Sequence, residues 1–166
     1  MRIGILGSGS MGGKLGTIFA RSGHEVVFSY SRSERKLKRL AREAGGHARA
    51  GTPREATLDA DALLLAVHWS RVADVLEQAG DLSGKVIISC SLPMNANDTA
   101  LAVAHTSSGA EVLARKVRKA GPLRIARYLE PFALVMAQLD SEITLCCKLL
   151  KTQAKFRGWE ARIRTR

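Results

Sequence analysis

A glycine-rich segment near the amino end of the sequence has the spacing that suits phosphate binding. Its six residues match the pattern G-x-G-x-x-G: Gly7, Ser8, Gly9, Ser10, Met11 and Gly12. The first glycine permits a tight turn, the second lets the backbone approach a pyrophosphate, and the third lets a helix pack closely on a sheet. The amides of Ser8, Ser10 and Met11 are expected to point at the phosphates from a helix N-terminus, where the helix dipole favours anions. The pattern follows an apolar run and opens a helical one, and this context predicts a dinucleotide site rather than a structural turn.

The residues after the second apolar run indicate which dinucleotide binds. An NAD site places an acid about 20 residues after the glycine loop, where it binds the ribose 2′-hydroxyl. Here the sequence from Tyr30 onward carries no carboxylate at that point. Ser31 and Ser33 can donate hydrogen bonds to a 2′-phosphate, Arg32 can pair with it, and Lys36 can supplement the charge. The sequence therefore predicts NADP(H) rather than NAD(H), and we assign an ordinary charged helix face only to the later cations Lys38, Arg39 and Arg42.

Short apolar runs alternate with helical patterns over the first 117 residues, which is typical of βαβ units. Strands are expected at Arg2–Leu6, Glu25–Tyr30, Ala48–Ala50, Ala62–Val67 and Val86–Ser91. Helices are expected at Ser10–Arg21, Glu34–Ala44, Pro53–Thr57, Ser70–Gln78 and Gly109–Arg118. The predicted fold class is α/β, a doubly wound (Rossmann), mostly parallel sheet with flanking helices, followed by a C-terminal helix and a basic tail.

The chain divides into three expected parts. Residues 1–120 form the dinucleotide-binding domain, and two capping boxes, Thr52–Glu55 and Ser108–Glu111, predict helix starts within it. After the break at Gly121-Pro122, residues 121–140 are expected to be helical, from about Leu123 to Leu139. Residues 141–166 form a basic tail, for which the sequence predicts no amphipathic face.

Composition narrows the function classes. The net charge is +11 and is concentrated in residues 111–166, which hold 13 of the 26 Lys and Arg residues but only 5 of the 15 acidic residues. Aromatic residues make up only 5% and no nucleic-acid-binding signature is present, so a solvated basic face is preferred to a nucleic-acid partner. No apolar run has the roughly 20 residues that a bilayer span needs, and no metal-ligand spacing exists. Three cysteines, two of them adjacent, favour reduced thiols and a cytoplasmic location.

Several motifs together resemble the NADP-dependent oxidoreductases that use the deazaflavin coenzyme F-420 (also written F420). The resemblance covers about residues 1–140. It is carried by the glycine loop and by Ser22–Val27, Ser31–Ser33, Ala66–Trp69, Ile88–Pro93, Thr106–Glu111 and Gly121–Pro131.

This resemblance implies hydride exchange between NADPH and a deazaflavin or flavin-like acceptor, usually in a homodimer. It assigns Ser31 and Arg32 to the 2′-phosphate, and Val67 and His68 to the strand edge beside the cofactor. No side chain need act as acid or base, because the protein mainly binds and orients the reactants. No catalytic residue is therefore assigned, and a surface position for His68 is an equal alternative.

One departure separates the chain from the family. The family continues with another strand and further elements after the helix that matches Gly109–Lys119, whereas here Gly121-Pro122 follows at once. This looks like an internal deletion. The alternative to an enzyme is therefore a truncated, catalytically impaired Rossmann module that binds NADP(H) as a sensor or structural ligand.

Overall fold

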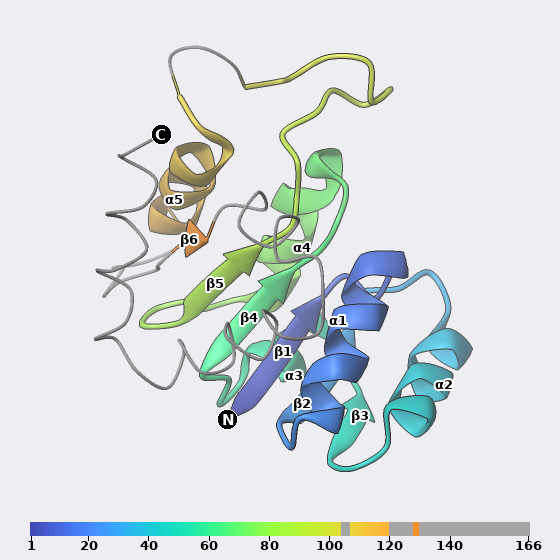
Figure 1. Ribbon diagram of the computed structural model, residues 1–166. Helices are drawn as coiled ribbons and strands as arrows, with labels where there is room; N and C mark the ends of the chain where they lie inside the picture. Colours follow the sequence, from blue (N-terminus) through green and yellow to red (C-terminus); the bar gives the residue numbers. More distant parts are fainter. Residues whose placement is uncertain (104–106, 120–127, 130–166) are drawn as a thin grey trace, which may run out of the picture. The chain divides into compact units, whose positions relative to one another are not determined.

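Six parallel strands form one sheet with helices against both of its faces (Figure 1). The computed structural model describes residues 1–103, 107–119 and 128–129 of the chain. The strands are β1 (Arg2–Leu6), β2 (Glu25–Ser29), β3 (Ala48–Ala50), β4 (Ala62–Leu65), β5 (Val86–Ser89) and β6 (Tyr128–Leu129). The helices are α1 (Ser10–Arg21), α2 (Glu34–Ala44), α3 (Pro53–Thr57), the 3-10 turn η1 (Trp69–Arg71), α4 (Val72–Ala79) and α5 (Gly109–Lys119).

The strand order is β3-β2-β1-β4-β5-β6, which confirms the doubly wound Rossmann class. The chain first builds outward from β1 through β2 to β3, then crosses back to place β4 on the other side of β1. Because all strands are parallel, their carboxyl ends meet at one edge. The crevice between the ends of β1 and β4, where the direction of winding reverses, is where such sheets bind ligands.

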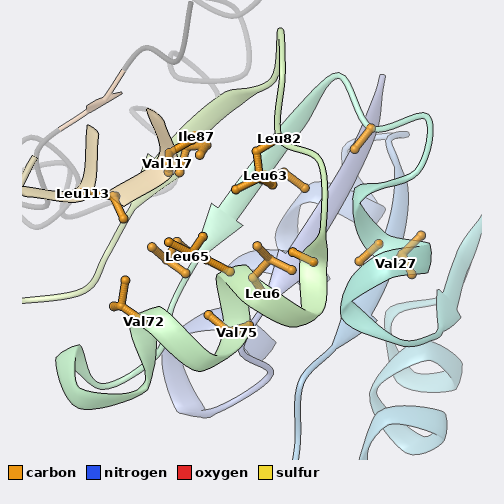
Figure 2. Close-up of a cluster of buried hydrophobic side chains, with 14 residues drawn as sticks. Leu6, Val27, Leu63, Leu65, Val72, Val75, Leu82, Ile87, Leu113 and Val117 are labelled. Carbon is orange, nitrogen blue, oxygen red and sulfur yellow. The ribbon is translucent and has the colours of Figure 1, made fainter. Parts of the chain in front are cut away.

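Apolar side chains cover both faces of the sheet. On one face Gly16 of α1 lies so close to Phe28 that an added Cβ would come within 2.3 Å of its ring. On the other face, a cluster of buried side chains joins the sheet to α3, α4 and α5 (Figure 2). Leu6 and Leu65 contribute to it from the strands, and Leu113 contributes from α5. The almost continuous apolar character of β4, with all four residues buried, follows from this coverage on both sides.

The predicted helix starts are confirmed. Thr52 accepts a hydrogen bond from the Glu55 amide at 3.2 Å, and the Glu55 carboxylate accepts from the Thr52 amide at 2.6 Å. Ser108 and Glu111 make the same reciprocal pair at the start of α5. These bonds satisfy amides that a helix leaves without partners in its first turn.

Some predicted boundaries were wrong by a few residues. The strands β2, β4 and β5 end one or two residues earlier than predicted, so Tyr30, Val67 and Ser91 lie beyond them. The helix predicted from Ser70 begins instead as the 3-10 turn η1 and becomes α-helical at Val72. Strand ends lose their regular pairing where the backbone turns toward the next element, and periodicity does not reveal that point.

The helix predicted over about 123–139 is wrong at Tyr128–Leu129, which pair as β6 with Ile87 and Ile88 of β5. The edge of β5 offers unpaired backbone groups, and pairing with them overrides a local helical pattern. A further strand after α5 is therefore present despite the apparent deletion. The remainder of 120–140 and the tail 141–166, with Cys146 and Cys147, lie outside the described residues. Residues 1–131 make up one compact unit, so β6 belongs with the sheet. Among the described helices, none is long and apolar enough to cross a membrane.

Candidate functional site

The glycine loop occupies the turn from β1 into α1. Gly7 has a φ of +112°, and a Cβ there would lie 2.4 Å from the Ala66 carbonyl oxygen, so this position requires glycine. A Cβ on Gly12 would lie 1.9 Å from the Gly7 carbonyl oxygen. Gly9 differs, because no described atom lies within 4 Å of the point that its Cβ would occupy. The loop is therefore closely packed at both ends and open in the middle.

The open side of the loop presents the amino end of α1. The first hydrogen bond of the helix runs from the Gly13 amide to the Gly9 carbonyl oxygen, at 3.0 Å. The amides of Ser10, Met11 and Gly12 precede it, and they have no acceptor within the described part of the chain. The first turn also contains no acidic residue. Amides and the positive end of a helix dipole are thus available to an anion here.

Ser8 does not behave as predicted. Its side chain is only 1% exposed, and its hydroxyl donates to the Ser29 carbonyl at 2.8 Å. Its amide donates to the Tyr30 carbonyl at 3.3 Å, so that amide does not point at a phosphate. The residue instead fastens the loop to the end of β2, because a buried polar group needs a partner. Among the three amides expected to face a phosphate, Ser10 and Met11 remain.

The predicted 2′-phosphate residues lie at the carboxyl end of β2. Ser33 caps α2 by accepting from the Lys36 amide at 3.3 Å, and the Ser33 amide donates to the Ser31 hydroxyl oxygen at 3.3 Å. Arg32 is exposed and forms no ion pair among the described residues. By contrast, Lys38 pairs with Glu34 at 2.6 Å. Within the described residues Arg32 is thus uncompensated at the strand end, as is Lys36 on α2, whereas Lys38 has an acidic partner.

Val67 and His68 follow β4 on the other side of the crevice. The Cγ1 atom of Val67 lies 2.6 Å from the point that a Cβ on Gly7 would occupy, so this segment packs against the glycine loop. The sequence therefore placed the glycine loop and Val67 correctly at one edge, and Ser31–Lys36 at the end of the neighbouring strand β2.

His68 is held by partners that the sequence did not predict. Its Nε2 lies 2.7 Å from Asp98 Oδ1, and its Nδ1 lies 2.8 Å from the Ser70 hydroxyl. The Ser70 amide also donates to Nδ1 at 3.3 Å, so Nδ1 is an acceptor and the Nε2–H donates to the Asp98 carboxylate. Asp98 is 30 residues away in sequence, in the segment after β5, and nothing in its local pattern indicated this contact.

A second contact that the sequence did not predict joins Tyr30, which directly follows β2, to Asp74 on α4. The Tyr30 hydroxyl donates to the Asp74 carboxylate of α4, and Gln78 Nε2 donates to the other carboxylate oxygen at 2.9 Å. Burial, with help from the Asp74 hydrogen bond, raises the pKa of Tyr30. The hydrogen bond from Tyr30 lowers the pKa of Asp74, and the bond from Gln78 adds to the effect.

Two further side chains of types that can do chemistry lie in the core. His24 is buried and packs edge-on against Phe19 with ring centroids 6.4 Å apart. Cys90 is buried at 8% exposure. No group of His, Cys, Asp or Glu in residues 1–103 and 107–119 is arranged to hold a metal ion.

The family model of coenzyme F420-dependent NADP oxidoreductases matches residues 2–93, more than half of the chain. The chain belongs to this family. The match runs from β1 past the end of β5, so it contains the glycine loop, the Arg32 segment and His68. The chain is thus a member of an NADP-dependent oxidoreductase family, in agreement with the resemblance described above.

Several solved structures share the fold of this chain. A candidate F420-dependent NADP reductase from Arthrobacter sp. FB24 is 21% identical, with a TM-score of 0.63 over 72% of this chain and 59% of its own. A hypothetical protein from Sinorhizobium meliloti is 20% identical, with a TM-score of 0.62 over 77% of this chain and 59% of its own. A reductive aminase from Aspergillus terreus, in complex with NADPH and ethyl levulinate, is 25% identical, with a TM-score of 0.54 over 76% of this chain and 39% of its own.

The chain therefore spans about three fifths of the length of the first two of these structures. A search of curated protein sequences finds no match. Family membership rests on the family model, and the solved structures establish the Rossmann-type fold.

Proposed function

We propose that this chain binds NADPH across the crevice between β1 and β4 and uses it to reduce a deazaflavin, such as coenzyme F-420, or a flavin-like acceptor. One observation carries the proposal. The glycine loop is packed too closely for side chains at Gly7 and Gly12 and is open at Gly9, and the neighbouring strand ends in an uncompensated Arg32. An open loop of amides suits a pyrophosphate, and an exposed guanidinium suits a 2′-phosphate.

The residues at the amino end of α1 would hold the pyrophosphate. The amides of Ser10, Met11 and Gly12 supply the hydrogen bonds, and the absence of a side chain on Gly9 allows the close approach. Ser8 supports them from behind by joining the loop to β2. These contacts are common to NADPH and NADH, so they set affinity without distinguishing the two cofactors.

The residues at the end of β2 would distinguish the two cofactors. Arg32 would pair with the 2′-phosphate, Ser31 and Ser33 would donate their hydroxyl protons to it, and Lys36 would add charge. Both hydroxyl oxygens already accept an amide proton in this structure, which orients them and leaves their own protons available to a ligand.

The far side of the crevice would receive the reacting end of the cofactor. Bound NADPH supplies a hydride, and the protein's part is to orient the two rings and exclude water. Val67 packs against the glycine loop, and His68 is fixed beside it by Asp98. Leu92 and Leu101, which are 61% and 59% exposed, lie in the segment after β5 and offer apolar surface to a planar acceptor.

Paired titrations with NADPH and NADH test the binding site. The wild-type protein should prefer NADPH, and Arg32→Ala should weaken NADPH binding by roughly 10- to 100-fold, the value of a charge-assisted hydrogen bond, with little effect on NADH. Arg39→Ala is the matched control, because Arg39 is an exposed arginine on α2 that pairs with Glu43 at 3.5 Å. Equal losses for both cofactors in Arg32→Ala would show that Arg32 does not read the 2′-phosphate.

The acceptor requires its own assay. NADPH oxidation is followed in the presence of coenzyme F-420, flavin mononucleotide or a ferric flavin complex. Turnover with the deazaflavin alone supports the family's acceptor, and turnover with a flavin alone moves the assignment to a flavin reductase. NADPH binding without turnover on any of these acceptors would contradict the reductase assignment.

The apparent internal deletion favours a second candidate function. Gly121-Pro122 follows α5 at once, whereas the family that the chain resembles continues there with further elements, and their loss would leave an acceptor site incomplete. A module that binds NADP(H) as a sensor or structural ligand would bind NADPH tightly and transfer no hydride. Robust turnover would exclude this function.

The family resemblance supports a proposal for the assembly of the chain, and its cysteines support one for its location. We infer a homodimer in the cytoplasm, where NADPH and reduced thiols coexist. Light scattering on the purified chain distinguishes a dimer from a monomer, and cell fractionation tests the location.

A further inference from the structure

Tyr30 adopts a backbone conformation that tyrosine rarely takes. Its φ is +54°, in the left-handed region, where an L residue with a side chain is strained. It is the first residue after β2 and the last before Ser31. The strain therefore lies at the hinge between the sheet and the segment that carries Ser31, Arg32 and Ser33.

Contacts from two other elements hold Tyr30 in this conformation. Its carbonyl oxygen accepts the Ser8 amide of the glycine loop at 3.3 Å. Its hydroxyl donates to the Asp74 carboxylate on α4, and its ring packs against the buried cluster of that face. Asp74 is itself fixed by Gln78 at 2.9 Å. Strained residues persist where their surroundings determine them in this way, and they concentrate at functional sites.

The side-chain contacts of Tyr30 help to fix the position of the segment that starts at Ser31. Gly7 and Ser8 hold the end of β2 through the backbone, because both amides donate to carbonyls at Ser29 and Tyr30. These backbone bonds do not depend on which side chain Tyr30 carries. The hydrogen bond from the Tyr30 hydroxyl to Asp74 does depend on the side chain, and it adds a polar contact between this hinge and α4 to the packing of the ring.

We infer that Tyr30 and Asp74 form a positioning pair that sets the preference for the 2′-phosphorylated cofactor, by fixing the hinge from which Ser31 and Arg32 extend. This inference rests on the proposed binding of NADPH. Neither residue needs to touch the cofactor. The contacts of Ser31 and Arg32 with the 2′-phosphate depend on this pair. The contacts of the pyrophosphate with the amino end of α1 do not.

The test compares affinities for NADPH and NADH in Tyr30→Phe, Asp74→Ala and the double variant. Tyr30→Phe keeps the ring and removes the hydroxyl, and Asp74→Ala removes the acceptor from the other side. Each single variant should raise the dissociation constant for NADPH about 3- to 10-fold and leave that for NADH within about twofold. The loss is smaller than for a direct charge-assisted hydrogen bond, because the pair affects the 2′-phosphate only through the position of Ser31 and Arg32. The double variant should be no worse than either single variant, because the two residues act through one bond.

Asp81→Ala is the matched control. Asp81 lies beyond the other end of α4, where its carboxylate accepts the Ser83 amide at 2.9 Å. This variant should leave both affinities unchanged. Circular dichroism and melting temperature report whether each variant is folded. Should Tyr30→Phe fail to fold, Asp74→Ala tests the same bond with the tyrosine intact.

The outcomes separate this inference from the proposed function. A wild-type protein that binds neither cofactor, or both equally, overturns the NADPH assignment and this inference with it. A wild-type protein that prefers NADPH, with variants that lose both cofactors equally or neither, overturns the positioning pair alone. A fall in the NADPH preference of both single variants supports it.

Discussion

His68 and Asp98 join the segments that follow β4 and β5, with His68 Nε2 lying 2.7 Å from Asp98 Oδ1. Asp98 has a φ of +55°, a conformation that aspartate and asparagine tolerate better than most residues. The segment around it turns back on itself, with an isolated antiparallel bridge between Met94 and Leu101. The imidazole therefore ties this turn to the edge at which the glycine loop lies.

The first prediction concerns that connection. Asp98→Asn preserves the tolerance for positive φ and removes the charge, whereas Asp98→Ala also removes the acceptor. Because an exposed hydrogen bond to a carboxylate contributes about as little as an exposed ion pair, about 0.2–1 kcal/mol, Asp98→Ala should speed amide hydrogen exchange at residues 94–102 by up to about fivefold, and Asp98→Asn should do so less.

Asp59→Ala provides the control for this measurement. Asp59 is also an exposed aspartate with positive φ, at +57°, and it pairs with Arg2 at 3.5 Å. Its replacement should not change exchange in the segment after β5. Unchanged exchange in Asp98→Ala would mean that His68 does not hold this segment.

The second prediction separates the two kinds of glycine in the loop. Gly12→Ala should destabilise the fold and abolish binding of both cofactors, because its Cβ would lie 1.9 Å from the Gly7 carbonyl oxygen. Gly9→Ala should leave the melting temperature unchanged, because its φ of −75° is ordinary and its Cβ meets no described atom within 4 Å. It should still weaken NADPH and NADH alike, by about tenfold or more, since the methyl group would occupy the approach of the pyrophosphate. Normal binding by a folded Gly9→Ala protein would place the phosphates elsewhere.

The third prediction concerns acid stability. Hydrogen bonds from the Ser107 hydroxyl and the Ser108 amide lower the pKa of Glu111 below its usual value of 4.5. A carboxyl whose pKa is lowered by folding stabilises the native state above its unfolded pKa, and this contribution is lost as the pH falls through the lower, folded pKa. Glu111→Gln should therefore melt at a lower temperature than the wild type at neutral pH. Below about pH 4.5 the difference between the two melting temperatures should become smaller.

Melting curves across this pH range check the sign. Glu77→Gln is a suitable control, because Glu77 is exposed on α4 and forms no ion pair among the described residues. A constant difference between Glu111→Gln and the wild type at every pH would show that the charge of Glu111 does not stabilise the start of α5.

Local chemistry made the fold and the glycine loop predictable, whereas contacts between distant residues were not. The spacing of Gly7 and Gly12, and the box formed by Thr52 and Glu55, are determined within one turn of chain, and sequence displays them directly. The contacts of His68 with Asp98 and of Tyr30 with Asp74 join residues 30 and 44 positions apart. No periodic pattern encodes such partners.

The same limit explains the two corrections at the sheet. The Ser8 amide points toward the Tyr30 carbonyl oxygen because of where β2 ends, and that position is set by tertiary structure rather than by the local sequence. The strand at Tyr128–Leu129 forms because it can pair with the open edge of β5. That edge is made by residues about 40 positions earlier, so the local sequence pattern gives no sign of it.

The last prediction tests whether α5 is an integral part of the fold. Leu113 is fully buried and packs in the cluster that also contains Leu65 and Ile87, although α5 lies beyond the matched family region (Figure 2). Leu113→Ala should cost about 2–5 kcal/mol of unfolding free energy, as deletions of buried leucine methyl groups do. Leu101→Ala removes the same atoms from a side chain that is 59% exposed and should cost far less. Denaturant melts of the two variants give the comparison, and equal stabilities would mean that α5 does not pack on the sheet in solution.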